Sequence, residues 1–211
     1  MRTGGCTVRL RPRIPLMPSA LRQTDFQRYW AEEYPASPPI GFALREKYND
    51  KWFRIHSLTG SKRYPESDGE TREVLDRHNA VLDALLGTDG AFVLLTTGYS
   101  DEPTPALPLL LRMDSTLNLS STFAFTATSD TGSPYWHFFV TALNWHRGCL
   151  DAVLAQVATD AVADVLVIGQ EQKCVYHPYD GGGDIIVRND EARTVLKQMF
   201  SAWLPPRADG L

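Results

Sequence analysis

Apolar residues recur at helical spacing in four stretches of the chain. The clearest stretch runs from about residue 68 to residue 86, where Ser67 and Glu70 form a capping box at the start and Gly87 follows the end. Its buried face is expected to contain Val74, His78, Val81, Leu82 and Leu85. Further helices are predicted over about residues 25–34, 148–159 and 190–204. The last of these is expected to turn inward Val195, Leu196, Met199, Phe200 and Trp203.

Alternating patterns and short apolar runs predict strands elsewhere. In the clearest alternation, Trp136, Phe138 and Val140 face away from the residues between them, which include His137. Strands are predicted over about residues 40–45, 51–57, 91–97, 109–113, 122–126, 135–140, 162–168, 173–179 and 184–188. Because strands outnumber helices and mostly follow one another, the order favours an α+β fold. We expect residues 23–211 to form a single domain, with a mixed, mostly antiparallel sheet packed with about four helices.

Charge is spread unevenly along the chain. The 211 residues carry a net charge of -4, yet residues 1–22 contain five arginines and no acid, which is +5. The rest must therefore carry -9, since 16 basic side chains face 25 acidic ones. An acid-free leader with three prolines predicts a disordered N-terminal extension, with Met17 as the alternative start of the protein. An arm that binds an acidic partner is the competing interpretation.

Composition excludes several classes of protein. A net charge of -4 disfavours nucleic acid as a partner, because such binding depends on neutralising phosphates. No charge-free stretch is long and apolar enough to span a bilayer, so no membrane contact is expected. Three cysteines, an odd and sparse number, argue against a disulfide framework and favour a cytoplasmic location. Since the chain lacks HExxH, GxSxG and GxGxxG motifs, catalysis is not favoured, and no cofactor is expected.

Two histidine–cysteine pairs raise the possibility of zinc. His146 with Cys149, and Cys174 with His177, supply four potential ligands. However, Cys174 and His177 lie in a predicted strand at a spacing that points them to opposite faces of a sheet. Reduced cysteines packed in the core are the favoured interpretation, and we predict no metal site. His78 and His137 are likewise expected to be packed, hydrogen-bonded side chains.

The strongest local feature is the segment from Tyr176 to Asp184, which holds three consecutive glycines between two aspartates. Glycine lets the backbone take positive φ and lets a ligand approach closely. The candidate binding side chains of this segment are His177, Tyr179, Asp180 and Asp184. They could bind a cation or a polar ligand. The alternative is a tight hairpin connection with a solvated acidic rim.

A basic loop forms the second candidate. Lys62, Arg63 and Tyr64 follow a Thr-Gly-Ser turn, and His56 lies shortly before it. Adjacent lysine and arginine beside such a turn could hold a phosphate or a carboxylate. The alternative is a solvated basic turn. The sequence leaves open whether this loop and the glycine-rich segment meet in space.

Two strings carry a resemblance to a known family. They are Ser61-Lys62-Arg63-Tyr64-Pro65 and His177-Pro178-Tyr179-Asp180-Gly181-Gly182 with Asp184. On these strings the chain, over about residues 24–211, resembles an uncharacterised family of bacterial proteins, a domain of unknown function. The resemblance implies a shared fold and an intracellular bacterial protein. By analogy it favours a toxin-neutralising immunity protein or another interaction protein.

Three functional hypotheses follow. The leading hypothesis is a non-enzymatic domain that binds a protein partner, based on the acidic charge, the missing catalytic motifs and five tryptophans that exceed the needs of a small core. The second is an enzyme acting on a small molecule or phosphoester. In it, Lys62 and Arg63 hold the anion while His177 and Asp180 exchange protons. The third is a structural subunit that only dimerises. The oligomeric state stays open.

Overall fold

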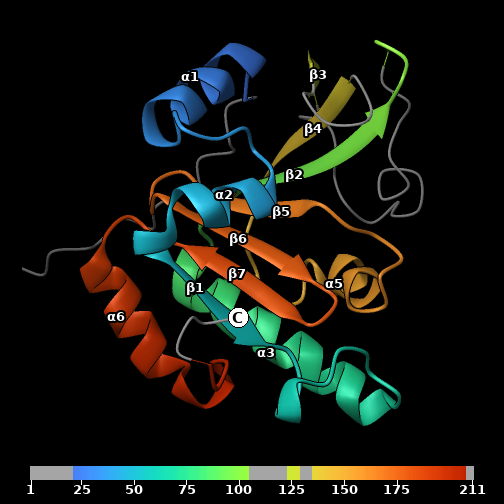
Figure 1. Ribbon diagram of the computed structural model, residues 1–211, viewed down its shortest axis with the longest axis vertical. Coiled ribbons are helices and arrows are strands. Elements are labelled where there is room, and N and C mark those ends of the chain that lie inside the picture. The colour runs from blue at the N-terminus through green and yellow to red at the C-terminus, as the bar shows by residue number, and fades with distance from the viewer. Residues whose placement is uncertain (1–20, 105–122, 129–134, 208–211) are drawn as a thin grey trace, which may run out of the picture.

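A seven-stranded sheet forms the centre of the computed structural model, which describes residues 21–104, 123–128 and 135–207 (Figure 1). The strands are β1 (Trp52–His56), β2 (Ala91–Ser100), β3 (Phe123–Thr128), β4 (Tyr135–Asn144), β5 (Val165–Gly169), β6 (Cys174–Tyr179) and β7 (Gly182–Ile186). Their order is β1-β7-β6-β5-β2-β4-β3, and each neighbouring pair is antiparallel. The predicted α+β fold is confirmed. The expected mixed character is not seen, since the described strands contain no parallel pair.

Helices cover both faces of this sheet. The described residues form five α-helices, namely α1 (Gln23–Glu33), α2 (Gly41–Lys47), α3 (Asp68–Leu86), α5 (Asp151–Ala158) and α6 (Asp190–Met199). Helices α3, α5 and α6 pack on one face, while α1 and α2 pack on the other (Figure 1). The sheet therefore separates two apolar clusters. The strands that lie between the two clusters therefore carry apolar side chains on both faces.

The central strands show why the sequence contains continuous apolar runs. In β2, Phe92 and Leu94 belong to the cluster beneath α3 and α5, whereas Val93 and Leu95 belong to the cluster beneath α1. All five residues of β5 are buried for the same reason. The predictions for α3 are also confirmed, because every residue expected on its inner face is buried. The same holds for Leu150, Val153, Leu154 and Val157.

The tryptophans belong to the core. Four of the five have 8% or less of their surface exposed, namely Trp30, Trp52, Trp136 and Trp145. Trp203 is partly buried, and its ring stacks on Phe200 at 5.1 Å. A helix layer on each face of the sheet makes two cores, so more large rings are accommodated than one core would need. The expected surplus of exposed tryptophan is therefore wrong.

Residues 40–45 form a helix, although the sequence predicted a strand there. The helix α2 begins after Ile40, and only Gly41 and Leu44 are buried within it. That spacing of three residues places both positions on one helical face. Most of the segment consists of strong helix formers, Ala43, Leu44, Arg45, Glu46 and Lys47. Because this segment is too short to show a clear period, helix propensity determines that it is a helix and not a strand.

The C-terminal helix is shorter and less buried than predicted. It ends at Met199, and a 3₁₀ turn over Ser201–Trp203 follows. Leu196 and Phe200 are buried, but Val195 and Met199 are 53% and 61% exposed. Because α6 packs at the edge of the sheet, beside β1, its buried stripe is narrow. The expectation that Val195 and Met199 turn inward is therefore wrong.

Two glycines of the glycine-rich segment lie in a strand rather than in a turn. Gly182 and Gly183 begin β7, and neither has positive φ. A Cβ on Gly182 would overlap the carbonyl oxygen of Ile55, and a Cβ on Gly183 would overlap the ring of Tyr176. The predicted need for positive φ is therefore wrong. The close approach that glycine permits is present, but it serves packing within the protein.

Parts of the sequence predictions lie outside the described residues. These include the N-terminal extension up to residue 20 and the strand predicted at about residues 109–113. Within the residues described, no helix combines the length and the apolar character needed to cross a bilayer.

We predict that Gly182→Ala destabilises the protein by at least about 2 kcal/mol, because the new methyl group meets rigid backbone that no side-chain rotation can move aside. Urea unfolding of the full chain measures this loss. Gly69→Ala in the first turn of α3 is the matched control, since a Cβ there meets only Ser67 Oγ at 3.8 Å. Equal stability of the two variants would contradict the packing account.

Candidate functional site

Three adjacent strands bring the two candidate segments to one edge of the fold. The register aligns Arg54 of β1 with Asp184 of β7, and Asp184 in turn with His177 of β6. Two residues further along β1, His56 aligns with Gly182. Because β1 and β7 are antiparallel, the loop after β1 lies beside the β6–β7 turn. The backbone N–H of the next residue, Ser57, donates to the Gly181 carbonyl at 3.1 Å.

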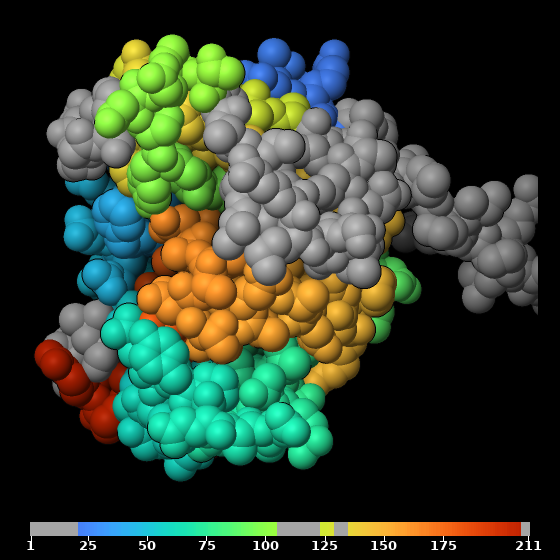
Figure 2. All heavy atoms as spheres, turned by 90° about the vertical axis from the view of Figure 1, so that its right-hand side faces the viewer, coloured from blue at the N-terminus to red at the C-terminus, as the bar shows by residue number. Residues whose placement is uncertain are grey.

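A hollow of about 240 Å³ lies where these segments meet. It is lined by Arg54, His56, Ser61, Arg63, Tyr179, Asp180 and Gly181. Figure 2 shows the teal atoms, from the end of β1 into α3, packed against the orange atoms of the β5–β7 region. The question that the sequence left open thus has a positive answer, because the basic loop and the glycine-rich segment do meet.

Arg54, which lines the hollow, forms a buried ion pair with Asp184 behind it in the sheet. Nε and Nη2 of Arg54 donate to the two carboxylate oxygens at 2.7 and 3.0 Å. The Asp184 side chain is 3% exposed and that of Arg54 is 15% exposed. The Tyr179 ring centre lies 4.8 Å from the guanidinium carbon of Arg54. Both ends of the pair are therefore held in place, which makes it part of the framework.

Arg54 was not among the residues singled out from the sequence. The sequence does contain an indication of its role, because an arginine flanked by Phe53 and Ile55 in an apolar strand needs a buried acidic partner. The identity of that partner came only with the strand register.

The outer wall is formed by a second and more open pair. Arg63 Nε donates to Asp180 Oδ2 at 2.5 Å. The Asp180 side chain is only 7% exposed, whereas that of Arg63 is 64% exposed. Tyr64 lies beside this pair, with its ring centre 5.3 Å from the Arg63 guanidinium carbon. A hydrogen bond to the Asp180 carboxylate raises the pKa of Tyr64 above its usual value.

His56 is half-buried at the hollow. Burial and the positive charges of Arg54 and Arg77 lower its pKa below the usual 6.5, so the ring is neutral at pH 7. Its backbone carbonyl accepts a hydrogen bond from Arg77 Nη1 at 2.9 Å. Arg77 is itself ion-paired with Glu73 on α3, so it ties the end of β1 to that helix.

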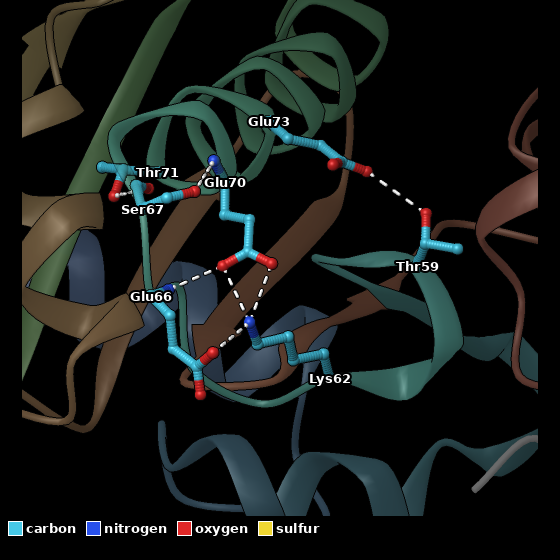
Figure 3. A network of polar contacts seen from close by, with 7 residues as sticks. All are labelled: Thr59, Lys62, Glu66, Ser67, Glu70, Thr71 and Glu73. Carbon is cyan, nitrogen blue, oxygen red and sulfur yellow. Dashed lines mark hydrogen bonds and ion pairs between the residues drawn. The ribbon is translucent and has the colours of Figure 1, made fainter.

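Lys62 is not among the residues that line the hollow, and Figure 3 shows it bound to Glu66 and Glu70 instead. Its Nζ donates to both oxygens of Glu70 at 2.8 Å and to Glu66 at 2.9 Å. Glu70 also accepts from the backbone N–H of Glu66, while Ser67 Oγ accepts from the backbone N–H of Glu70. This network caps the start of α3 and engages the ammonium group of Lys62. The structure thus separates Lys62 from Arg63, which the sequence had grouped as one anion-binding pair.

His177 also lies outside the hollow. Its ring packs under α2 so closely that a Cβ on Gly41 would overlap it. Its Nδ1 is buried without a hydrogen-bond partner, and burial lowers its pKa. The structure therefore does not bring His177 and Asp180 together as an acid–base pair. Of the eight candidates named from the sequence, the hollow is lined by His56, Arg63, Tyr179 and Asp180.

A closed polar chain lies on the opposite face of β1. His78 Nε2 is 3.1 Å from Ser57 Oγ, and its Nδ1 is hydrogen-bonded to the hydroxyl of Tyr176. All three side chains are 1% exposed or less. Burial lowers the pKa of His78 to about 4, so the ring is neutral at pH 7. The expectation of a packed, hydrogen-bonded His78 is confirmed, as it is for His137, whose ring bonds Ser100 and Thr126.

The proposed zinc ligands are kept apart. Cys174 belongs to the cluster beneath α3 and α5, and burial raises its thiol pKa to about 12. His177 points to the other face of the sheet, under α2. Across the described parts of the chain, no group of three or more His, Cys, Asp or Glu side chains is arranged to hold a metal ion.

Residues 40–208 match a known protein family, described as "Domain of unknown function (DUF3885)". The match includes both segments that form the hollow and omits α1. No curated protein and no solved structure matches the chain.

We predict that His78 makes stability depend on pH between 6.5 and 4. Because the folded state lowers its pKa, the neutral ring stabilises the fold fully above pH 6.5, and this contribution is lost as the pH falls towards 4. The loss amounts to about 3 kcal/mol. Urea unfolding at several pH values measures it, with His78→Gln as the comparison.

The variant starts from lower stability at pH 7, since it breaks the chain to Ser57 and Tyr176. It should nevertheless lose about 3 kcal/mol less than the original chain over the same range. Equal losses in the two proteins would show that His78 does not titrate in this way.

Proposed function

The chain belongs to the DUF3885 family, whose description assigns no activity, and from that premise we propose that this protein is a ligand-binding domain. Its ligand is a small molecule whose acidic group enters the hollow between β1, the loop after it and the β6–β7 turn. The observation that carries the proposal is the state of Arg63. Its guanidinium group is largely exposed at the hollow, yet it is anchored at one edge by a buried carboxylate.

An anchored arginine is well suited to bind an anion. Asp180 accepts from Nε, so the outward edge of the Arg63 guanidinium, with Nη1 and Nη2, keeps its donors for a ligand. Arg54 likewise uses Nε and Nη2 on Asp184 and keeps Nη1. Both groups are oriented before a ligand arrives. This reduces the conformational entropy that binding would otherwise cost.

Binding is better supported than catalysis. The alternative hypothesis needed His177 and Asp180 to exchange protons, but His177 is packed under α2 and Asp180 is paired with Arg63. Ser57 and His78 are within hydrogen-bonding distance, as in a nucleophile and base, yet both are 1% exposed or less. A substrate atom could not reach that serine without local opening.

The protein-interaction hypothesis keeps part of its basis. The acidic charge of residues 23–211 still favours a basic partner. The tryptophans no longer support this hypothesis, because they belong to the two cores. A small hollow with oriented charged groups is the more specific observation, so ligand binding is the function we propose.

We predict that Arg63→Gln weakens binding of a small anion at least tenfold, because it removes the charge and the outward pair of N–H donors. The measurement is a titration of the full chain, followed by backbone amide NMR shifts at fixed ionic strength. The probes are acetate, benzoate and inorganic phosphate, each tested separately. The amide spectrum also checks that the variant is folded, because the Asp180 side chain is only 7% exposed and loses its charged partner.

Arg147→Gln is the matched control. Arg147 is 48% exposed and also donates to a carboxylate, that of Asp83, at 2.5 Å, but it lies outside the hollow. It should leave binding of each anion unchanged. If no probe binds in a way that depends on Arg63, the proposed function is wrong.

A further inference from the structure

We infer that the hollow selects a small organic acid with a single carboxylate over a phosphate, an inference that rests on the proposed function. It concerns the class of ligand and follows from three features of the site: its charge balance, the donors that remain available, and its walls.

The charges around the hollow balance. Arg54 is offset by Asp184 and Arg63 by Asp180, in both cases through direct hydrogen bonds. His56 adds no positive charge at pH 7, because burial and the nearby arginines lower its pKa. A phosphate dianion would therefore bring two negative charges to a place without excess positive charge. A carboxylate brings one, and its desolvation is correspondingly less costly.

The groups that would favour phosphate are engaged elsewhere. Lys62, the nearest lysine in sequence, is held by Glu66 and Glu70. The start of α3 follows the basic loop, but its first turn carries the acidic residues Asp68 and Glu70, and the N–H of Glu70 is capped within the protein. Ser67 Oγ accepts from the N–H of Glu70, and the Ser67 carbonyl accepts from Thr71. Phosphate sites commonly combine a lysine with such a helix start. Here the lysine is engaged and the helix start is acidic.

The remaining donors suit a planar group. Nη1 and Nη2 of Arg63 lie in one plane and present two parallel N–H bonds, the geometry that a carboxylate accepts in bidentate fashion. Asp184 already binds Arg54 through two hydrogen bonds with this planarity. A phosphate can accept from the same edge through two of its oxygens, so the charge balance is what distinguishes the two ligands.

An aromatic ring, that of Tyr179, provides an apolar wall for the rest of the molecule. Tyr179 lines the hollow and covers Arg54, and the ring of Tyr64 lies beside Arg63. A volume of about 240 Å³ leaves room for a short organic body behind the carboxylate. The ligand class is therefore a compact monocarboxylic acid with an apolar or aromatic body.

The test compares acetate and benzoate with inorganic phosphate, by amide NMR titration of the full chain at pH 7 and fixed ionic strength. We expect at least one of the two carboxylates to bind at least tenfold more tightly than phosphate. We also expect Arg63→Gln to abolish that preference. Asp180→Asn provides the second variant, because it removes one negative charge from the hollow while keeping a hydrogen-bond acceptor for Arg63. It should raise the affinity for phosphate at least threefold.

The outcomes separate this inference from the proposed function. Phosphate binding that depends on Arg63 and equals or exceeds carboxylate binding overturns the inference and leaves the proposed function standing. An Asp180→Asn variant with unchanged phosphate affinity overturns the charge-balance argument, and with it the inference. If neither the carboxylates nor phosphate respond to Arg63→Gln, both the inference and the proposed function are wrong.

Discussion

The ion pair between Arg54 and Asp184 is the constraint on which the site depends. Two opposite charges sit on adjacent strands within the sheet, and removing either would leave the other buried without a partner. The pair requires β1 and β7 to keep one register, since a slip by one residue would turn each side chain to the opposite face. That register also requires glycine at position 182, where the strand passes the backbone of Ile55. The glycine-rich segment is therefore a consequence of close strand packing.

The same three strands carry two polar systems with different exposures. On the α3 face, Ser57, His78 and Tyr176 form a chain closed to solvent, which joins the end of β1, α3 and β6. On the α2 face, the polar residues run from the buried Asp184 to the exposed Arg63. The closed system stabilises the position of the loop after β1. The polar residues on the α2 face include charged groups that the loop after β1 holds at the surface. In this way a rigid sheet supports a binding site at its edge.

Long periodic elements could be predicted from the sequence, while the site depended on contacts between distant residues. The inner face of α3 and the alternation in β4 followed from spacing alone, because both are long enough to show a period. Residues 40–45 were too short for that, and helix propensity decided. The role of Lys62 could not be read from its neighbour Arg63. Its position depends on Glu70, eight residues away on α3, and that of Arg63 on Asp180 in the β6–β7 turn.

A double-mutant cycle on Arg54 and Asp184 tests the central claim most directly. The free energy of unfolding is measured for the original chain, Arg54→Met, Asp184→Asn and the double variant. A pair that organises the site should show a coupling energy of at least about 2 kcal/mol, because each single change leaves a buried charge without its partner. Losses that add within about 0.5 kcal/mol would contradict the account, since the two side chains would then act independently.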